Sequence, residues 1–239
     1  MATVRRESLE IERALRFFLD DPRWVPKILV GALFTALTVF LIGNFWVAGY
    51  MVRVVRRASR AERYPLPEWD DMAGIFRDGL RAMAVYVGHL FPLVVLLTLL
   101  GLALAGAISL LDNARGGATG AEVMLLLLVL AGYILFTLIS LVLLLYLPAA
   151  FARFAVEDRV RAAFEPRETY WFIRRNLSNY SLALLAFFVA GFLSQFGLIL
   201  FCVGIFPTTF WCTCVLGYSL GEVVRRAEKD AEPTKPQGD

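Results

Sequence analysis

The 239-residue sequence has very few of the side chains on which enzymes and metal sites usually depend. It contains one histidine, His89, and three cysteines, Cys202, Cys212 and Cys214, which all lie in apolar sequence. A Cys-x-Cys spacing on a helix directs the two thiols to different sides, so neither a disulfide nor a metal clamp is expected. The sequence therefore predicts no metal site and no cofactor.

Charged side chains are nearly absent from the interior of the apolar runs. The strongly polar side chains there are Asn44 and Gln195, and Glu222 lies near the end of the last run. Ion-coupled carriers generally place carboxylates inside the membrane, so this absence argues against ion-driven transport. It leaves facilitated passage of an apolar or lipid-like solute open. The chain also lacks a nucleic-acid-binding signature, and no nucleic acid is expected as a partner.

Apolar residues, by contrast, make up 59% of the chain, and the mean hydropathy is +0.64. Soluble domains contain about 45–50% apolar residues, and about 18 consecutive apolar residues are enough to span a bilayer. We predict an all-α polytopic membrane protein with four transmembrane helices plus an N-terminal segment that turns back or crosses once. The apolar segments are 28–52, 83–111, 123–147, 182–203 and 207–224.

The distribution of basic residues predicts the topology. If the loop 112–122 and the turn 204–206 face outside, Arg115 is the only one of the 24 Lys and Arg residues on that side, as the positive-inside rule requires. Segment 28–52 must then return to the side from which it entered. We predict a re-entrant hairpin that turns at Gly43–Asn44, with Asn44 as a cap, and both termini in the cytoplasm at the inner membrane.

Three amphipathic stretches precede apolar runs, near Ile11, Met72 and Pro166. Helices that combine aromatic residues and arginines in this way lie in the membrane interface or pack on the cytoplasmic face of their own protein. We expect Glu12 and Arg16 to pair in the first stretch, Asp70 or Asp71 to cap the second, and Pro166 to open the third.

An internal quasi-repeat suggests how the chain is organised. Phe45–Ala58 and Phe210–Ala227 carry the same Phe-Trp, Gly-Tyr and Val-Val-Arg-Arg-Ala blocks in the same order, and internal repeats are frequent in membrane folds. We predict one membrane domain, 1–227, followed by a disordered cytoplasmic tail, 228–239. The domain would consist of three units, each with an interfacial helix and a membrane hairpin, at 7–57, 70–153 and 165–227.

Basic residues that follow the first hairpin and the last helix form the main candidate binding surface. Each basic residue near an anionic leaflet contributes about 1 kcal/mol, so the cluster suits phospholipid headgroups or an acidic partner, while setting the topology is the alternative role. The connector 64–71, with acidic residues beside the arginines, suits a structural clasp or a docking surface. The candidates are Arg53, Arg56, Arg57, Arg60, Arg63, Arg225, Arg226 and the interfacial Trp69.

Four polar residues within the apolar runs are further candidates: Asn44, His89, Gln195 and Ser219. Ser219 lies in Gly217–Gly221, a literal G-x-S-x-G, and an intramembrane dyad with His89 is conceivable. That motif works in hydrolases on a strand-to-helix turn, whereas here it lies within an expected helix. Its two glycines fit close helix packing better.

Several motifs resemble a prokaryotic membrane family known as domain of unknown function 4013. They are Asp20–Leu33, Gly49–Leu80 with its Leu-Pro-x-Trp-Asp-Asp and Asp-Gly-Leu elements, and the closing Gly217–Ala227. The resemblance covers nearly the whole chain. It implies a multi-pass membrane fold but no activity and no functional residues.

These observations favour a non-enzymatic membrane scaffold or accessory subunit. We expect its basic cytoplasmic face to bind anionic lipid headgroups, other membrane proteins or a second copy of the chain. A carrier for a lipid-like solute is the alternative, and an intramembrane serine hydrolase is third. A headgroup-sized cavity at the arginines would favour binding or transport, whereas a flat apolar face would favour a scaffold.

Overall fold

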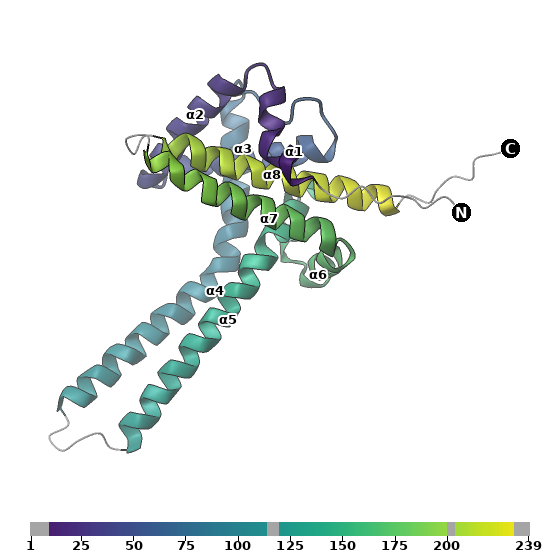
Figure 1. The fold of residues 1–239 in the computed structure, drawn as a ribbon. Coiled ribbons are helices and arrows are strands. Elements are labelled where there is room, and N and C mark those ends of the chain that lie inside the picture. The colour runs from purple at the N-terminus through teal and green to yellow at the C-terminus, as the bar shows by residue number, and fades with distance from the viewer. Residues whose placement is uncertain (1–9, 114–119, 200–203, 232–239) are drawn as a thin grey trace. The chain divides into compact units, whose positions relative to one another are not determined.

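A computed structural model of the chain describes residues 10–113, 120–199 and 204–231. Within these ranges the chain is helical, with no strand, and the expected all-α class is confirmed (Figure 1). The α-helices are α1 (Ile11–Arg16), α2 (Trp24–Ala36), α3 (Gly43–Ser59), α4 (Met72–Asn113), α5 (Gly120–Glu157), α6 (Pro166–Arg175), α7 (Leu177–Ser194) and α8 (Ile205–Ala231). Short 3₁₀ turns are η1 (Phe17–Asp20), η2 (Leu37–Phe40), η3 (Val160–Phe164) and η4 (Gln195–Ile199).

The chain divides into two compact units. Unit 1 comprises Met1–Val85 and Pro148–Asp239, and unit 2 comprises Tyr86–Leu147. The long helices α4 and α5 each contribute one end to unit 1 and the other to unit 2. The three predicted units of interfacial helix and hairpin stay a prediction. Helix α8 continues to Ala231, so the first residues of the expected disordered tail are helical, and the rest lie outside the described residues.

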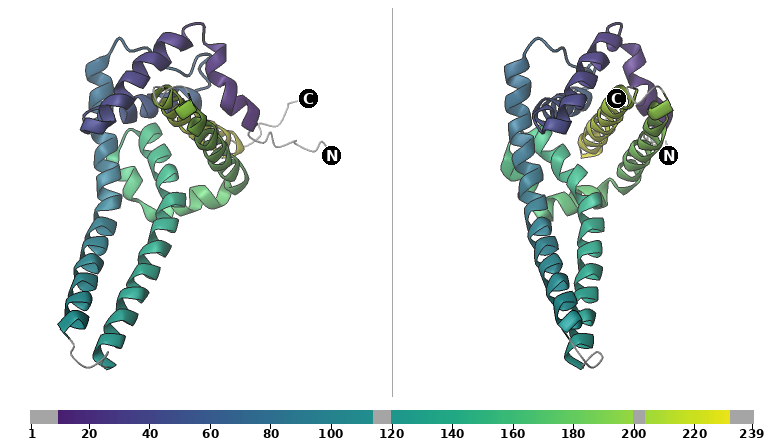
Figure 2. Two further views of the ribbon diagram at one scale, coloured as in Figure 1. Left: turned by 60° about the vertical axis from the view of Figure 1, so that its left-hand side comes forward. Right: turned by 90° about the vertical axis from the view of Figure 1, so that its left-hand side faces the viewer.

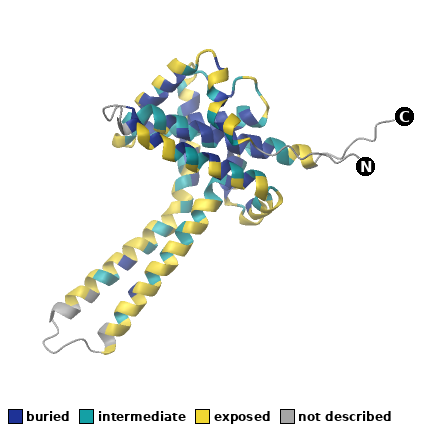
Figure 3. Cartoon of the chain, viewed as in Figure 1, coloured by how far each residue is buried: buried dark blue, intermediate teal, exposed yellow. Residues whose placement is uncertain are grey.

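Unit 2 consists of the apolar parts of α4 and α5. The most apolar stretch of each helix has almost no buried residue, and exposed residues predominate along both helices in Figure 3. Leu100 and Val129 are the buried large side chains described in this unit. A pair of helices with so little internal burial needs an apolar environment, because exposed apolar surface is unfavourable in water.

Unit 1 is built around α8. This helix packs against α2, α3 and α7, and the right-hand view of Figure 2 shows it between α2 and α7. Its backbone comes close to that of α3, where an added Cβ at Gly221 would lie 2.5 Å from the Val55 carbonyl oxygen and one at Gly217 3.3 Å from the Met51 carbonyl oxygen. The expected packing role of the two glycines is therefore confirmed.

The structure breaks the predicted hairpin segment 28–52 into two helices. Helix α2 is followed by η2, the chain turns at Leu41, which has a left-handed φ of 65°, and α3 begins at Gly43. The break thus lies just before the predicted Gly43–Asn44 position. The predicted cap is wrong, because Asn44 lies inside α3, whose N-cap residue is Ile42 with no side-chain cap hydrogen bond. The Asn44 amide instead donates to the Leu41 carbonyl (3.1 Å) at the turn.

Three helical stretches are long and apolar enough to cross a membrane, at Met72–Gly106, Val123–Glu157 and Leu177–Gly197. They correspond to three of the four predicted transmembrane helices and indicate a membrane protein. Within the described residues, helix α8 is not among the stretches that are long and apolar enough to cross a membrane. A fourth span would result only if Ile11–Asp20 and Trp24–Phe40, which are bent by 104°, were one broken segment.

The amphipathic stretches take two forms. Helices α1 and α6 are separate and short, whereas the stretch near Met72 is the first part of the 42-residue helix α4. The expected local contacts are confirmed: Arg16 pairs with Glu12 at 2.9 Å, and the Gly74 amide donates to the Asp71 carboxylate at 3.0 Å. Pro166 opens α6, as predicted.

Candidate functional site

The predicted arginine cluster forms a stripe along one side of α3. Four arginines at spacings of three, four and seven residues line a cavity of about 340 Å³ together with Pro67, Glu68 and Asp70 of the connector. The arginines are Arg53, Arg56, Arg57 and Arg60.

Three members of this stripe are engaged within the protein. Arg53 contacts Asp71 at 2.7 Å and Asp78 at 3.0 Å. Arg56 contacts Asp78 at 3.2 Å and Asp158 at 2.7 Å, and its Nε donates to a backbone carbonyl of α5. The hydrogen bond from Arg53, aided by the Gly74 amide, holds the pKa of the Asp71 carboxyl below its usual range.

Arg57 is engaged in the same way as its neighbours. It pairs with Glu62 and donates to the Leu66 carbonyl at 3.0 Å. Arg60 is exposed and makes no ion pair with a described residue. The carboxylates around the smaller cavity therefore neutralise most of its arginines, and these contacts join α3 to α4, to the end of α5 and to the connector.

The connector is a structural clasp, as one of the two interpretations of its sequence predicted. Buried Lys27 contacts Asp21 at 2.6 Å and Glu68 at 2.7 Å, and it donates to the Leu66 carbonyl at 3.0 Å. Trp69 donates to the Lys27 carbonyl (3.0 Å) and stacks on Tyr50, with ring centroids 4.4 Å apart. Trp69 thus packs against the core of unit 1 and lines neither cavity.

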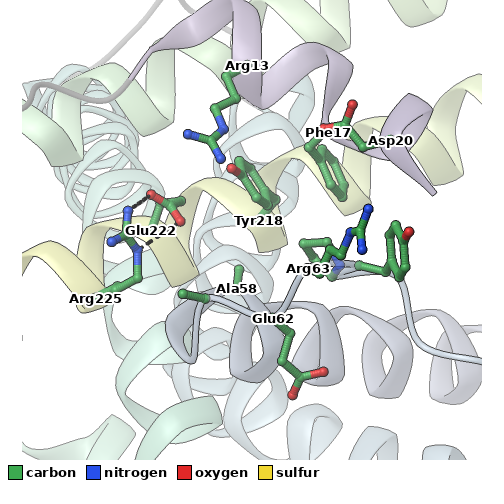
Figure 4. A pocket seen from close by; sticks show the side chains of 12 residues that line it. Arg13, Phe17, Asp20, Ala58, Glu62, Arg63, Tyr218, Glu222 and Arg225 are labelled. Carbon is green, nitrogen blue, oxygen red and sulfur yellow. Dashed lines mark hydrogen bonds and ion pairs between the residues drawn. The ribbon is translucent and has the colours of Figure 1, made fainter.

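A larger cavity, of about 620 Å³, lies where three segments of unit 1 meet (Figure 4). One wall comes from α1 and η1, a second from the end of α3 and the residues after it, and a third from α8. The lining residues are Arg13, Phe17, Asp20, Ala58, Ala61, Glu62, Arg63, Tyr64, Pro65, Tyr218, Glu222 and Arg225.

Two of the three carboxylates in this lining are neutralised by arginines. Glu222 accepts two hydrogen bonds from Arg225, at 3.0 and 2.6 Å, and lies 3.4 Å from Arg226. Glu62 pairs with Arg57, which lies outside the cavity. The expected basic residues at the end of α8 are therefore engaged with Glu222.

Three other charged residues of the larger cavity have no such partner. Arg13, Asp20 and Arg63 are exposed and form no ion pair with any described residue. Arg63 lies over the ring of Tyr64, with its guanidinium carbon 5.3 Å from the ring centroid. Figure 4 shows Arg13 and Asp20 extending from one wall and Arg63 from another. These charges are available to a ligand.

An aromatic pair forms the apolar part of the cavity. The rings of Phe17 and Tyr218 stack at 4.4 Å with an interplanar angle of 7°, and Phe17 is buried. Together with Tyr64, they give the cavity an aromatic surface beside its charged groups. The described lining residues include no serine, cysteine or histidine, and what they offer is guanidinium, carboxylate, phenol and ring faces.

The other predicted site residues lie apart from this cavity. Ser219 is fully buried on α8, and its hydroxyl has no partner among the described residues. His89 belongs to unit 2, where its ring centroid lies 5.6 Å from that of Tyr146. Gln195 is the first residue of η4 and is exposed. Asn44 lies at the turn between α2 and α3.

Several residues of the larger cavity were missing from the sequence-based candidates. Arg13, Phe17 and Asp20 follow the spacing i, i+4, i+7, and so do Tyr218, Glu222 and Arg225. Such spacing puts three side chains on one side of a helix and was available as a signal. Nothing in the sequence indicates that the two triplets meet in the fold.

Comparisons with known proteins show to which family the chain belongs. Searches of curated proteins and of solved structures found no match of significance. A family model matches residues 32–203, which include the cavity wall at 58–65 but neither α1 nor the cavity residues of α8. Of the motifs that suggested the family, the match contains Gly49–Leu80, whereas Gly217–Ala227 and most of Asp20–Leu33 lie outside it. The match confirms the family itself, and the chain belongs to the family described as "Protein of unknown function (DUF4013)".

Proposed function

We propose that this chain is a non-enzymatic integral membrane protein that binds phosphate-bearing lipid headgroups and acts as a scaffold or accessory subunit. The observation that carries the proposal is the pair Arg13 and Arg63. Both guanidinium groups line a cavity of about 620 Å³ and lack a carboxylate partner among the described residues. Ligand sites for small molecules commonly have volumes of about 300–1,000 Å³.

Guanidinium groups suit phosphate because they present several N–H donors in a planar fork. Charge-assisted hydrogen bonds of this kind are stronger than neutral ones. The arginines of the smaller cavity are less suited, since Arg53, Arg56 and Arg57 already bind carboxylates. A headgroup-sized cavity beside free arginines favours lipid binding over a scaffold that acts through a flat apolar face.

The apolar turn between α2 and α3 supports a re-entrant segment. Val39, Phe40, Leu41 and Ile42 are 74%, 70%, 74% and 56% exposed. Four large apolar side chains at one turn would be unfavourable in water, whereas lipid would accommodate them. The proposal therefore has this turn entering the membrane and α3 returning to the cytoplasmic side.

Helix α8 can cross the membrane with fewer apolar residues than its neighbours. It is covered by α2, α3 and α7, so its polar side chains need not face lipid. With α4, α5, α7 and α8 crossing and α2–α3 turning back, both termini are cytoplasmic, at the inner membrane.

A binding titration tests the lipid proposal. The full chain in mild detergent is titrated with a fluorescent short-chain phosphatidylglycerol, and anisotropy gives the dissociation constant. Loss of a charge-assisted contact costs about 1.5–3 kcal/mol, so R13A/R63A should weaken binding at least about tenfold. The control R16A/R161A removes the same charge from exposed positions outside the cavity. Equal affinity of the two variants, or no saturable binding of any phospholipid by the wild type, would overturn the proposal.

A further inference from the structure

The larger cavity offers a free carboxylate as well as two free guanidinium groups. Asp20 lines the cavity from η1, is exposed and has no ion-pair partner among the described residues. Arg63 extends from a different wall (Figure 4), and no ion pair joins it to Asp20 among the described residues. The cavity thus contains unmatched charges of both signs that do not neutralise one another.

These charges disfavour a ligand that carries only negative charge. Such a headgroup would gain from Arg13 and Arg63 but would be repelled by Asp20, because like charges at short range repel each other. A ligand with a phosphate and a cationic nitrogen would match all three groups.

The type of cationic nitrogen follows from the chemistry of the acceptor. A carboxylate such as Asp20 gains from N–H donors, and a primary ammonium group has three. A quaternary ammonium group has none and is recognised by aromatic faces instead. The cavity presents both features, since the stacked rings of Phe17 and Tyr218 line it together with Asp20. The carboxylate nevertheless favours the primary amine.

We infer that the larger cavity recognises a phosphoethanolamine group, with its phosphate at Arg13 and Arg63 and its ammonium group at Asp20. The inference rests on the proposed headgroup binding and names the headgroup class. The chemistry is shared by phosphatidylethanolamine in the membrane and by soluble glycerophosphoethanolamine, so the experiment includes both.

Competition against the fluorescent phosphatidylglycerol tests the inference. Unlabelled short-chain lipids with ethanolamine, choline or glycerol headgroups are added to the full chain in detergent, and the concentration at which each displaces the probe is measured. The wild type should prefer the ethanolamine lipid over the choline lipid by about tenfold, the effect of one charge-assisted hydrogen bond. D20N should abolish this preference and raise the affinity for the glycerol lipid, because the repulsion by the carboxylate is removed.

The matched control is E12Q. It removes one negative charge from α1, at an exposed residue outside the cavity, and it should keep the preference for ethanolamine. Because Asp20 forms no ion pair with a described residue, we expect D20N to fold, and a thermal melt checks this. Displacement by glycerophosphoethanolamine as effectively as by the lipid would identify a free headgroup as the ligand. Displacement by the lipid alone would identify the membrane lipid, and both results support the inference.

Two failures can be told apart. If the wild type binds ethanolamine and choline lipids equally, or if E12Q loses the preference as D20N does, the inference is overturned while headgroup binding stands. If no lipid displaces or binds with saturation, the proposed function itself fails.

Discussion

Gly49 of α3 and Gly79 of α4 show how single residues determine the packing of unit 1. A Cβ added at Gly49 would collide with the Ile75 carbonyl oxygen, and one added at Gly79 would collide with the Phe45 carbonyl oxygen. The two backbones therefore pass each other at a distance that only glycine permits. This contact lies beside the arginine stripe and keeps Arg53 within reach of Asp78.

Substitution of Gly49 by alanine should destabilise the protein. Overpacking typically costs about 1–3 kcal/mol, and here the obstructing atom belongs to the backbone, which cannot rotate away. Thermal unfolding in detergent measures the effect. Gly101→Ala is the control, because an added Cβ there meets nothing within 4 Å, and it should be neutral or slightly stabilising. Equal losses in the two variants would contradict the packing described.

The pair of Arg53 and Asp71 predicts a dependence of stability on acid. The pKa of Asp71 is lowered in the folded protein by the Arg53 hydrogen bond and then by the Gly74 amide. A lowered pKa means that the stabilising contribution is fully present above the unfolded value, about 4. It is lost as the pH falls through the folded pKa.

Asp71→Asn should therefore lower the unfolding temperature at pH 7. The difference in unfolding temperature between the variant and the wild type should shrink as the pH falls below about 4. Unfolding temperatures between pH 7 and pH 3 measure this. Glu12→Gln provides the comparison, since Glu12 belongs to an exposed pair and its loss should change little. A gap between D71N and wild type that stays constant across this range would contradict the role assigned to Asp71.

At the scale of elements, the helical hairpin α2–η2–α3 has an apolar surface at its turn and a basic surface at its other end. Its turn carries exposed apolar residues, and the far end of α3 carries the arginine stripe. The hairpin would therefore have its apolar turn in lipid and its basic end at the headgroups. This arrangement would also put the larger cavity, which Ala58 at the end of α3 helps to line, near the membrane surface.

A spin label at position 40 tests the location of the turn. Phe40→Cys, in a background in which the three native cysteines are alanine, is labelled and reconstituted in vesicles. We expect collisions with oxygen, which concentrates in lipid, and few with a water-soluble nickel chelate. Arg60→Cys, beyond the other end of α3, should show the reverse. Nickel accessibility at position 40 equal to that at position 60 would place the turn in water.

At the scale of the whole molecule, apolar runs predicted most of the helices. Their length and composition indicated α4, α5 and α7 directly, since these helices expose apolar residues along most of their length. Helix α8 was predicted as a transmembrane helix but is less apolar than the other three, and this has a physical reason. Ser219 of this helix is buried, and Gly217 and Gly221 pack against α3. Contacts with neighbouring helices therefore contribute to its stability beside hydrophobicity.

The location of breaks and sites was harder to predict. Glycine and asparagine suggested a turn at Gly43–Asn44, but the chain turns at Leu41, in a left-handed conformation that sequence rarely signals for leucine. The arginine cluster was predicted as one surface. Its carboxylate partners, such as Asp78 and Asp158, come from other elements, and so do the free groups of the larger cavity. Only the tertiary arrangement separates engaged arginines from available ones.

The central claim is that the chain binds a phospholipid through Arg13 and Arg63. Native mass spectrometry of the full chain, extracted from its own membrane in mild detergent, tests this most directly and also reports how many copies associate. The account predicts a protein peak that carries one retained phospholipid per chain, with the lipid lost from R13A/R63A and kept by R16A/R161A. A wild-type spectrum without retained phospholipid, or equal retention by both variants, would contradict it.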